Sequence, residues 1–287
     1  MAMTKYTLTD FEKQFPDDAA CLDWLRAYLY PNGIHCTKCD RVTKHHRVVS
    51  RRSYSCDRCG HHVHPTAGTI YHKSPTPLRL WFHAIYRMAS TRCGISAKQL
   101  ERETGVTYKT AWRMAKQIRS MLNESPGTLM GRVEIDDTYV GGKRSGGKTG
   151  RGAPGKTVVL GMVERQGPVV AKVVPNLKIK TVMPIIKDTI PSTHTEVFSD
   201  ELAVYERIHW AGYKHRTLRH GDGVYGIGSI HTNTIEGFWS LVKRGIGGVY
   251  HSVSPKYLQS YINEYGFRYN HRHDERPMFL SFLGQVR

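Results

Sequence analysis

The feature that most constrains how this chain can fold is a pair of Cys-x-x-Cys motifs, Cys36 with Cys39 and Cys56 with Cys59. Two such motifs can bring four thiolates into a tetrahedron around one Zn²⁺ ion. The segment between them, residues 40–55, can form the strands of a zinc ribbon. Because four thiolates leave no open position on the metal, we expect the zinc to hold this small module together rather than to catalyse a reaction.

Positive charge dominates the composition. Lys and Arg total 42 against 24 Asp and Glu, which gives a formal net charge of +18. A surface with this excess of cations favours a polyanionic partner, and DNA or RNA is the usual one. No apolar run approaches the roughly 20 residues that a membrane span requires, and the polar N-terminus does not resemble a signal peptide. We therefore expect a cytoplasmic protein without disulfides and without a membrane partner.

The distribution of apolar residues divides the chain into three predicted parts. A helical region with a break at Pro16 precedes the cysteine-rich ribbon, and together they fill residues 1–75. Residues 76–125 are typical of helices, and turn-forming residues at 123–131 indicate a linker. Beyond it, residues 130–287 alternate between strand-like and helix-like runs, which predicts an α/β domain with a mixed sheet flanked by helices. The expected strands are 132–140, 157–165, 168–175, 195–199 and 214–219, and the expected helices are 178–190, 201–211, 231–245 and 255–271.

A helix-turn-helix is expected at residues 96–122. The sequence SAKQLERETGVTYKTAWRMAKQIRSML predicts a helix, a tight turn at Gly105 and a second helix capped by Thr107. In a helix-turn-helix the second helix enters the major groove of DNA. An ordinary helical hairpin without a ligand is the alternative, and the net charge favours DNA. Four side chains of the second helix would then face DNA: Tyr108, Lys109, Thr110 and Arg113.

A loop rich in glycine and in basic residues occupies positions 141–157. It matches the P-loop pattern twice, but a working P-loop opens a helix, whereas the strand-like sequence VVLGMVE follows here. Nucleotide hydrolysis is therefore not expected. We predict instead that the loop contacts DNA phosphates through its cations, which include Lys148, Arg151 and Lys156.

Three carboxylates stand in segments that could bring them together. Asp136 lies in the strand-like run RVEIDDTYV, Asp200 ends the strand-like run TEVFSD, and Glu236 lies in the helix-like run HTNTIEGFWSLVKR. Hard divalent cations such as Mg²⁺ prefer oxygen ligands and keep positions open for water and phosphate. Strand alternation puts Asp136 and Asp137 on opposite faces and does not by itself choose between them. The three acids predict a site that handles metal and phosphate together.

The helix around Glu236 offers further polar side chains. Asn233 precedes Glu236 by about one helical turn, so the two side chains share a face. Lys243 follows two turns later on roughly the same face. A metal ligand, a polar side chain that orients it and a cation for phosphate would thus lie along one edge of the helix.

Three blocks of the sequence, EIDDTYVGGK, VFSDELAVY and HTNTIEGFWSLVKRGIGGVYH, resemble those of bacterial insertion-sequence transposases with a DDE, RNase H-like catalytic domain. In the group concerned, a zinc ribbon precedes that domain; CTKC and CDRC match the ribbon, and GRGAPGKT resembles the group's basic loop. The resemblance covers nearly the whole chain. It implies that Asp136, Asp200 and Glu236 are the catalytic acids, and it favours Asp136 over Asp137. One small departure is Asp137 itself, where members often have Glu.

The resemblance also implies a reaction and its partners. The three acids would hold two Mg²⁺ (or Mn²⁺) ions for strand cleavage and strand transfer, without a covalent protein–DNA intermediate. The partners would be double-stranded DNA, as element ends and target, and further copies of the chain in a homodimer or larger homo-oligomer. The protein would then be associated with the bacterial nucleoid. Further candidates to contact DNA are Arg219, His220, Asn233, Lys243 and Arg244.

Three other functions remain as alternatives. An RNase H-like nuclease or resolvase would cleave DNA without forming strand-transfer products. A regulator without enzymatic activity would use the ribbon and the helix-turn-helix and would leave the three acids idle. A tyrosine recombinase would use Tyr269, in RYNHRH, and would not need a divalent metal.

Overall fold

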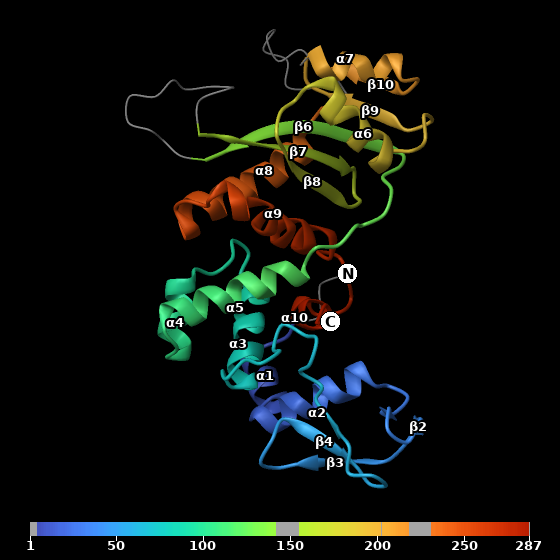
Figure 1. The fold of residues 1–287 in the computed structure, drawn as a ribbon. Coiled ribbons are helices and arrows are strands. Elements are labelled where there is room, and N and C mark those ends of the chain that lie inside the picture. The colour runs from blue at the N-terminus through green and yellow to red at the C-terminus, as the bar shows by residue number, and fades with distance from the viewer. Residues whose placement is uncertain (1–4, 142–154, 202, 218–230, 287) are drawn as a thin grey trace. The chain divides into compact units, whose positions relative to one another are not determined.

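The computed structural model describes residues 5–141, 155–201, 203–217 and 231–286 (Figure 1). The chain divides into two compact units, one formed by Met1–Met121 with His273–Arg287 and the other by Leu122–Arg272. This division differs from the three predicted segments. The sequence predicts that residues 273–287 belong to the strand-rich region, but in the structure they belong to the unit that holds the cysteines.

An aromatic core explains why the C-terminal segment joins the first unit. Helix α10 (Met278–Leu283) packs on α3 (Leu78–Ser90). Its Phe279 is buried, with ring centroids 5.8 Å from Phe11 and 5.9 Å from Phe15. Burying a phenylalanine side chain stabilises a fold by roughly 1.5–3 kcal/mol, so this short apolar helix contributes to the first unit's core.

The first unit begins with two helices that separate at Pro16, as the sequence predicted. Helix α1 (Leu8–Gln14) starts with a capping box between Thr7 and Asp10, and α2 (Asp18–Leu29) is capped by the Asp17 side chain. The cysteine-rich segment then forms two small antiparallel sheets. They contain β1 (His35–Cys36) with β2 (Arg41–Val42), and β3 (His45–Val48), β4 (Ser53–Cys56) and β5 (His62–Val63) in the order β3-β4-β5.

The predicted pair of helices follows α3. Helix α4 (Ala97–Thr104) is capped at its start by the Ser96 hydroxyl and ends at Gly105, whose φ of 70° is the left-handed conformation that glycine adopts easily. Helix α5 (Tyr108–Met121) follows after a short turn, and the backbone N–H of Thr110 donates to the Thr107 hydroxyl. The helix, turn and helix therefore form within one residue of the predicted bounds.

The second unit is built on a five-stranded sheet in the order β10-β9-β6-β7-β8. Three strands form an antiparallel meander, and two later strands add in parallel on the other side of β6. A meander followed by parallel strands fits the RNase H-like fold. The strands are β6 (Arg132–Val140), β7 (Thr157–Glu164), β8 (Val169–Val174), β9 (Glu196–Ser199) and β10 (Lys214–Thr217).

Helices cover both faces of this sheet, and each face has its own apolar core (Figure 1). On one face, Val133 and Ile135 of β6 pack with residues of α6 (Ile179–Thr189) and α7 (Ala203–Trp210). On the other, residues of β7 pack with α8 (Asn233–Gly245) and α9 (Pro255–Asn270). A π-helical turn, Ile246–Tyr250, continues α8. The two strand faces are therefore distinguished by which helices they meet.

Two further observations concern the segment after the glycine-rich loop and the length of the helices. The segment after the glycine-rich loop, from Thr157 onward, is strand β7 and not a helix, so the P-loop pattern lacks the context that it needs. In the part of the chain that the structure describes, no helix is both long and apolar enough to span a lipid bilayer.

Candidate active site

The sheet register brings Asp136 and Asp200 together. Strands β6 and β9 run parallel, with Val133 opposite Val197 and Ile135 opposite Ser199. Asp136 and Asp200 occupy the next position on each chain. Neighbouring strands lie about 4.8 Å apart, and positions that are level across a sheet point to the same face. The register thus brings two residues that are 64 positions apart in sequence to neighbouring positions, and the charge of Asp200 acts on the Asp136 carboxyl.

Contacts of the neighbouring residues identify that face. Asp137 accepts a hydrogen bond from the hydroxyl of Tyr205 on α7, at 3.2 Å. Glu134, which shares the face of Asp136, contacts the first turn of α8. Asp136 therefore faces α8, the helix on which Glu236 lies, whereas Asp137 faces the opposite side and is 8% exposed. The alternation left open which aspartate would be catalytic; the structure separates the two by face.

Glu236 lies in the first turn of α8 and is exposed. Its Oε1 accepts a hydrogen bond from Thr232 Oγ1 at 2.9 Å, and its backbone N–H donates to the Thr232 carbonyl at 3.1 Å. Thr232 is the residue before the helix, and its hydroxyl caps no backbone N–H. That hydroxyl instead fixes the direction of the Glu236 carboxylate.

Electrostatics show that the acids act on one another. The pKa of Asp136 is raised to about 7, chiefly by burial and in addition by the negative charges of Asp137, Asp200 and Glu236. A carboxylate among like charges holds its proton unless a cation offsets the repulsion. The donor set, three carboxylates of which two are half-buried and one is exposed, has the oxygen chemistry that Mg²⁺ and Mn²⁺ prefer.

The three carboxylates are more loosely spaced than the thiolates. Among the described residues, only the four cysteines form a group of three or more metal-ligating side chains whose ligand atoms all lie within 4.8 Å of one another. The three carboxylates therefore do not form a closely held metal cluster of this kind.

The buried carboxylate of Glu134 was missed by the sequence reasoning. It is 0% exposed and accepts hydrogen bonds from the backbone N–H groups of Thr234 and Ile235, at 2.8 and 3.0 Å. It also accepts from Thr234 Oγ1 at 2.9 Å and from Arg165 Nε at 2.7 Å. A charged residue on a buried strand two positions before Asp136 was the only sequence signal, and its partners lie far away in the chain.

The remaining candidates on α8 lie at the surface. Asn233, Lys243 and Arg244 are exposed, and Arg244 Nε donates to the Ser240 carbonyl at 3.3 Å. Lys156 is half-buried just before β7. Four other candidates lie outside the described residues: Lys148, Arg151, Arg219 and His220.

The cysteines form the predicted cluster. Sγ of Cys36 lies 3.5 Å from Sγ of Cys59, and Sγ of Cys39 lies 3.9 Å from Sγ of Cys56. Thr43 Oγ1 lies 3.2 Å from the Cys56 sulfur, and this contact, together with the backbone N–H groups of Arg58 and Cys59, lowers the pKa of that thiol to about 6. Four sulfurs within 4.8 Å, one of them favoured as thiolate, fit Zn²⁺.

The second helix of the predicted helix-turn-helix has the expected faces. Tyr108, Lys109 and Arg113 are exposed and Thr110 is half-buried, while Ala111, Met114 and Ile118 are buried. Arg113 Nη2 donates to Ser74 Oγ at 3.3 Å. The exposed face is thus cationic and aromatic, although its contact with DNA stays a prediction.

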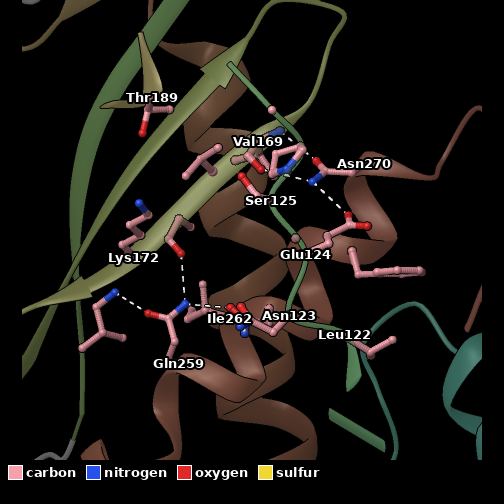
Figure 2. A pocket seen from close by; sticks show the side chains of 18 of the residues that line it. Leu122, Asn123, Glu124, Ser125, Val169, Lys172, Thr189, Gln259, Ile262 and Asn270 are labelled. Carbon is pink, nitrogen blue, oxygen red and sulfur yellow. Dashed lines mark hydrogen bonds between the residues drawn. The ribbon is translucent and has the colours of Figure 1, made fainter. Parts of the chain in front are cut away.

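A cavity of about 520 Å³ in the second unit lies elsewhere, where residues 122–127, edge strand β8 and α9 meet. Figure 2 shows the side-chain amides of Gln259 and Asn270 bonded to the β8 backbone. Gln259 bonds to Val173 N and the Ala171 carbonyl, and Asn270 bonds to the backbone of Val169. These amides occupy the edge of the sheet that a further strand would otherwise pair with. None of the predicted catalytic residues is among the lining residues.

Tyr269, the nucleophile of the rival recombinase, is part of a packed face. Its ring lies 5.5 Å from that of Phe238, and the Arg272 guanidinium lies 3.8 Å from its centroid. Burial raises the pKa of the Tyr269 hydroxyl, which disfavours the phenolate. The position suits packing between α8 and α9.

The sheet order fits an RNase H-like domain, and the cysteine cluster defines a zinc ribbon in a separate unit. Residues 128–270 match the family described as the ISXO2-like transposase domain, and residues 16–62 match the transposase zinc-ribbon domain. A protein of the transposable element ISH50 from Halobacterium salinarum is 28% identical over 279 residues, which cover 89% of this chain and 92% of the relative. The chain belongs to the insertion-sequence transposases that have an N-terminal zinc ribbon.

Proposed function

We propose that this transposase cleaves and joins DNA strands with Asp136, Asp200 and Glu236 as the ligands of catalytic Mg²⁺ or Mn²⁺. The observation that supports this most is the convergence of the three acids. The parallel register of β6 and β9 sets two of them side by side, and the charges of Asp200 and Glu236 both act on the pKa of Asp136. Without a cation, this gathering of negative charge is costly in a partly buried position.

Each acid has a distinct part in the proposed site. Asp136, whose pKa both other acids raise, would supply carboxylate oxygens from β6. Asp200 would supply them from the position after β9, and Glu236, directed by Thr232, from α8. Bound divalent cations would activate the attacking water or 3′-hydroxyl and stabilise the leaving oxygen. No side chain has to form a covalent bond to DNA.

Binding of the element ends falls to the first unit in this proposal. The exposed face of α5, with Tyr108, Lys109 and Arg113, would enter the major groove. The zinc-held ribbon would add phosphate contacts through its basic side chains. Cations of the second unit, Lys156, Lys243 and Arg244 among them, would hold the phosphates near the acids. Each chain has one acid triad, whereas an element has two ends to be cleaved. We therefore expect a homodimer or larger homo-oligomer on DNA.

The proposal is tested by incubating the zinc-loaded full chain with DNA that contains candidate element ends and a labelled target, with Mg²⁺ or with EDTA. We expect nicking and strand-transfer products with Mg²⁺ only, and neither with Glu236→Gln. Cleavage without strand transfer would favour the nuclease or resolvase. DNA binding without any metal-dependent cleavage would favour the regulator, and activity in EDTA that Tyr269→Phe abolishes would favour the recombinase.

A further inference from the structure

We infer that Glu134 is a positioning residue, which sets the distance between the Asp136 strand and the Glu236 helix and thereby tunes how tightly the acids bind divalent cations. The inference rests on the proposed function, because it assigns a role in the same cation site. It concerns a residue that touches neither DNA nor metal in that proposal and acts only through its neighbours.

The first argument is the way in which α8 begins. A helix leaves its first backbone N–H groups without partners, and the side chain just before the helix normally accepts one of them. Here that residue, Thr232, makes no such bond because its hydroxyl donates to Glu236. Glu134, from strand β6, accepts the N–H groups of Thr234 and Ile235 instead. The cap of α8 is therefore supplied by the strand that also contains Asp136.

The second argument is the short path between the two catalytic acids. Glu134 and Asp136 are two residues apart on one strand and point to the same face. The N–H of Ile235, bound by Glu134 Oε2 at 3.0 Å, immediately precedes Glu236. A movement of the start of α8 away from β6 would break these bonds and separate Glu236 from Asp136 at the same time. The carboxylate of Glu134 thus couples the two positions.

The third argument is that the Glu134 charge is itself fixed. Arg165 donates from Nε to Glu134 at 2.7 Å and from Nη2 to the His231 carbonyl at 2.7 Å. Its guanidinium also lies 4.2 Å from the centroid of the Phe198 ring on β9. Arg165 therefore contacts β6, β9 and the residue that leads into α8. His231 Nδ1, 3.3 Å from Glu134 Oε1, adds a second positive partner when protonated.

A purely structural cap would not require this charge. Buried ion pairs are often no more stabilising than apolar side chains of similar size, and their best-attested use is to fix one arrangement among several. Glu134 is fully buried, and its bonds to Thr234 and Ile235 join β6, which bears Asp136, to α8, which bears Glu236. Residues that orient metal ligands in this way typically change metal affinity or activity by about 10–100-fold when altered.

The test compares Glu134→Gln with the wild type in the zinc-loaded full chain. The amide of glutamine keeps the shape but has one acceptor oxygen, so it cannot receive all the donors that Glu134 receives. We expect the dissociation constant for Mn²⁺, measured by electron paramagnetic resonance, to rise about tenfold or more. The Mg²⁺ concentration for half-maximal cleavage should rise in parallel, with affinity for element-end DNA unchanged.

Glu264→Gln is the matched control. Glu264 is also 0% exposed in the second unit, and it pairs with Arg268 on α9, with 2.5 Å between Oε1 and Nη2. This variant should lower the melting temperature while leaving the Mn²⁺ dissociation constant as in the wild type. If both variants weaken Mn²⁺ binding equally, Glu134 acts through stability alone and the inference is wrong.

Two further measurements keep the outcomes separate. Should Glu134→Gln fail to fold, Thr234→Val removes one donor to Glu134 and keeps the backbone bonds; we expect Mn²⁺ binding several times weaker, and wild-type binding would overturn the inference. Asp136→Asn identifies the site, since it should abolish Mn²⁺ binding. If Mn²⁺ binds at the Asp136 site with the same affinity in Glu134→Gln as in the wild type, only the positioning role of Glu134 is refuted. If the wild-type protein binds no Mn²⁺, both the cation site and the proposed function are refuted.

Discussion

Gly161 of β7 packs against Trp239 of α8 so closely that a Cβ atom added to Gly161 would lie 2.3 Å from Cζ2 of the indole. Gly161 is also the cross-strand partner of Asp136 in the antiparallel pairing of β6 and β7. The missing side chain allows α8 to approach the sheet beside the carboxylate that the helix faces. Glycine within a strand often indicates such a close approach.

Gly161→Ala should therefore impair the site more than the fold. The added methyl group must displace Trp239 or lift α8, and overpacking of this kind costs about 1–3 kcal/mol. We expect Mg²⁺-dependent cleavage to fall at least tenfold at a temperature where circular dichroism shows the variant folded, since Glu236 moves with the helix. Cleavage at the wild-type rate would show that the distance between α8 and the sheet does not affect catalysis.

A glycine of α9 supplies the control for this variant. A Cβ atom added to Gly266 would meet nothing within 4 Å. Alanine is favoured over glycine inside a helix by about 1 kcal/mol, so Gly266→Ala should raise the free energy of unfolding slightly and leave cleavage unchanged. A loss of cleavage in Gly266→Ala would mean that small changes anywhere in these helices disturb the site.

The sequence predicted most of the second unit because its signals are local. Strand β6 has the predicted bounds, 132–140, since Val133 and Ile135 alternate with acids and face one apolar core. The end of β9 beside Asp200 was equally visible. Spacing alone could not show that Asp136 faces α8, because alternation gives two faces and does not say which helix covers each.

Two features depended on contacts distant in sequence and were not predictable. Glu134 resembled an ordinary strand acid, because its partners Thr234 and Ile235 lie about a hundred positions away. Helix α10 was not predicted, and residues 273–287 were assigned to the strand-rich region, whereas their contacts lie in the first unit. Its apolar sequence MFLSFL needs an apolar surface, but nothing local identifies the aromatic residues of the first unit as that surface.

The raised pKa of Asp136 predicts how stability depends on pH when no metal is present. The folded value is about 7 and the ordinary value is 3.8. Between these values the folded state keeps a proton that the unfolded state has lost. The contribution of Asp136 to the free energy of unfolding is therefore greatest below about pH 4. It falls by on the order of 4 kcal/mol as the pH rises to about 7.

Thermal unfolding in EDTA across this pH range measures the effect. Asp136→Asn should remove the pH dependence of stability that Asp136 contributes, because the amide does not titrate. Mg²⁺ should stabilise the wild type more at pH 8 than at pH 5, since binding requires the deprotonated acid. For the same reason, cleavage at subsaturating Mg²⁺ should increase through about pH 7. A pH profile of stability that is identical in wild type and Asp136→Asn would contradict the shift.

The four clustered cysteines should hold one Zn²⁺ ion in the ribbon. Replacing Cys36 with serine removes one of four ligands, and we expect the zinc content, measured by mass spectrometry, to fall from about one ion per chain to nearly none. Cys93→Ser is the control, because Cys93 lies outside the cluster. It should retain zinc. A Cys36→Ser protein with full zinc occupancy would mean that another side chain, such as a nearby histidine, completes the site.

The exposed face of α5 should contribute to DNA affinity through phosphate contacts. Lys109 is exposed in the first turn of that helix. If its ammonium group neutralises one phosphate, Lys109→Ala should weaken binding to element-end and to unrelated DNA alike, and the slope of log K against log salt should shrink by about one. Fluorescence anisotropy at several salt concentrations measures both quantities. Lys13 is another exposed lysine, on α1, and Lys13→Ala provides the control for loss of charge alone. If both variants change the slope equally, the effect comes from net charge and α5 has no special contact with DNA.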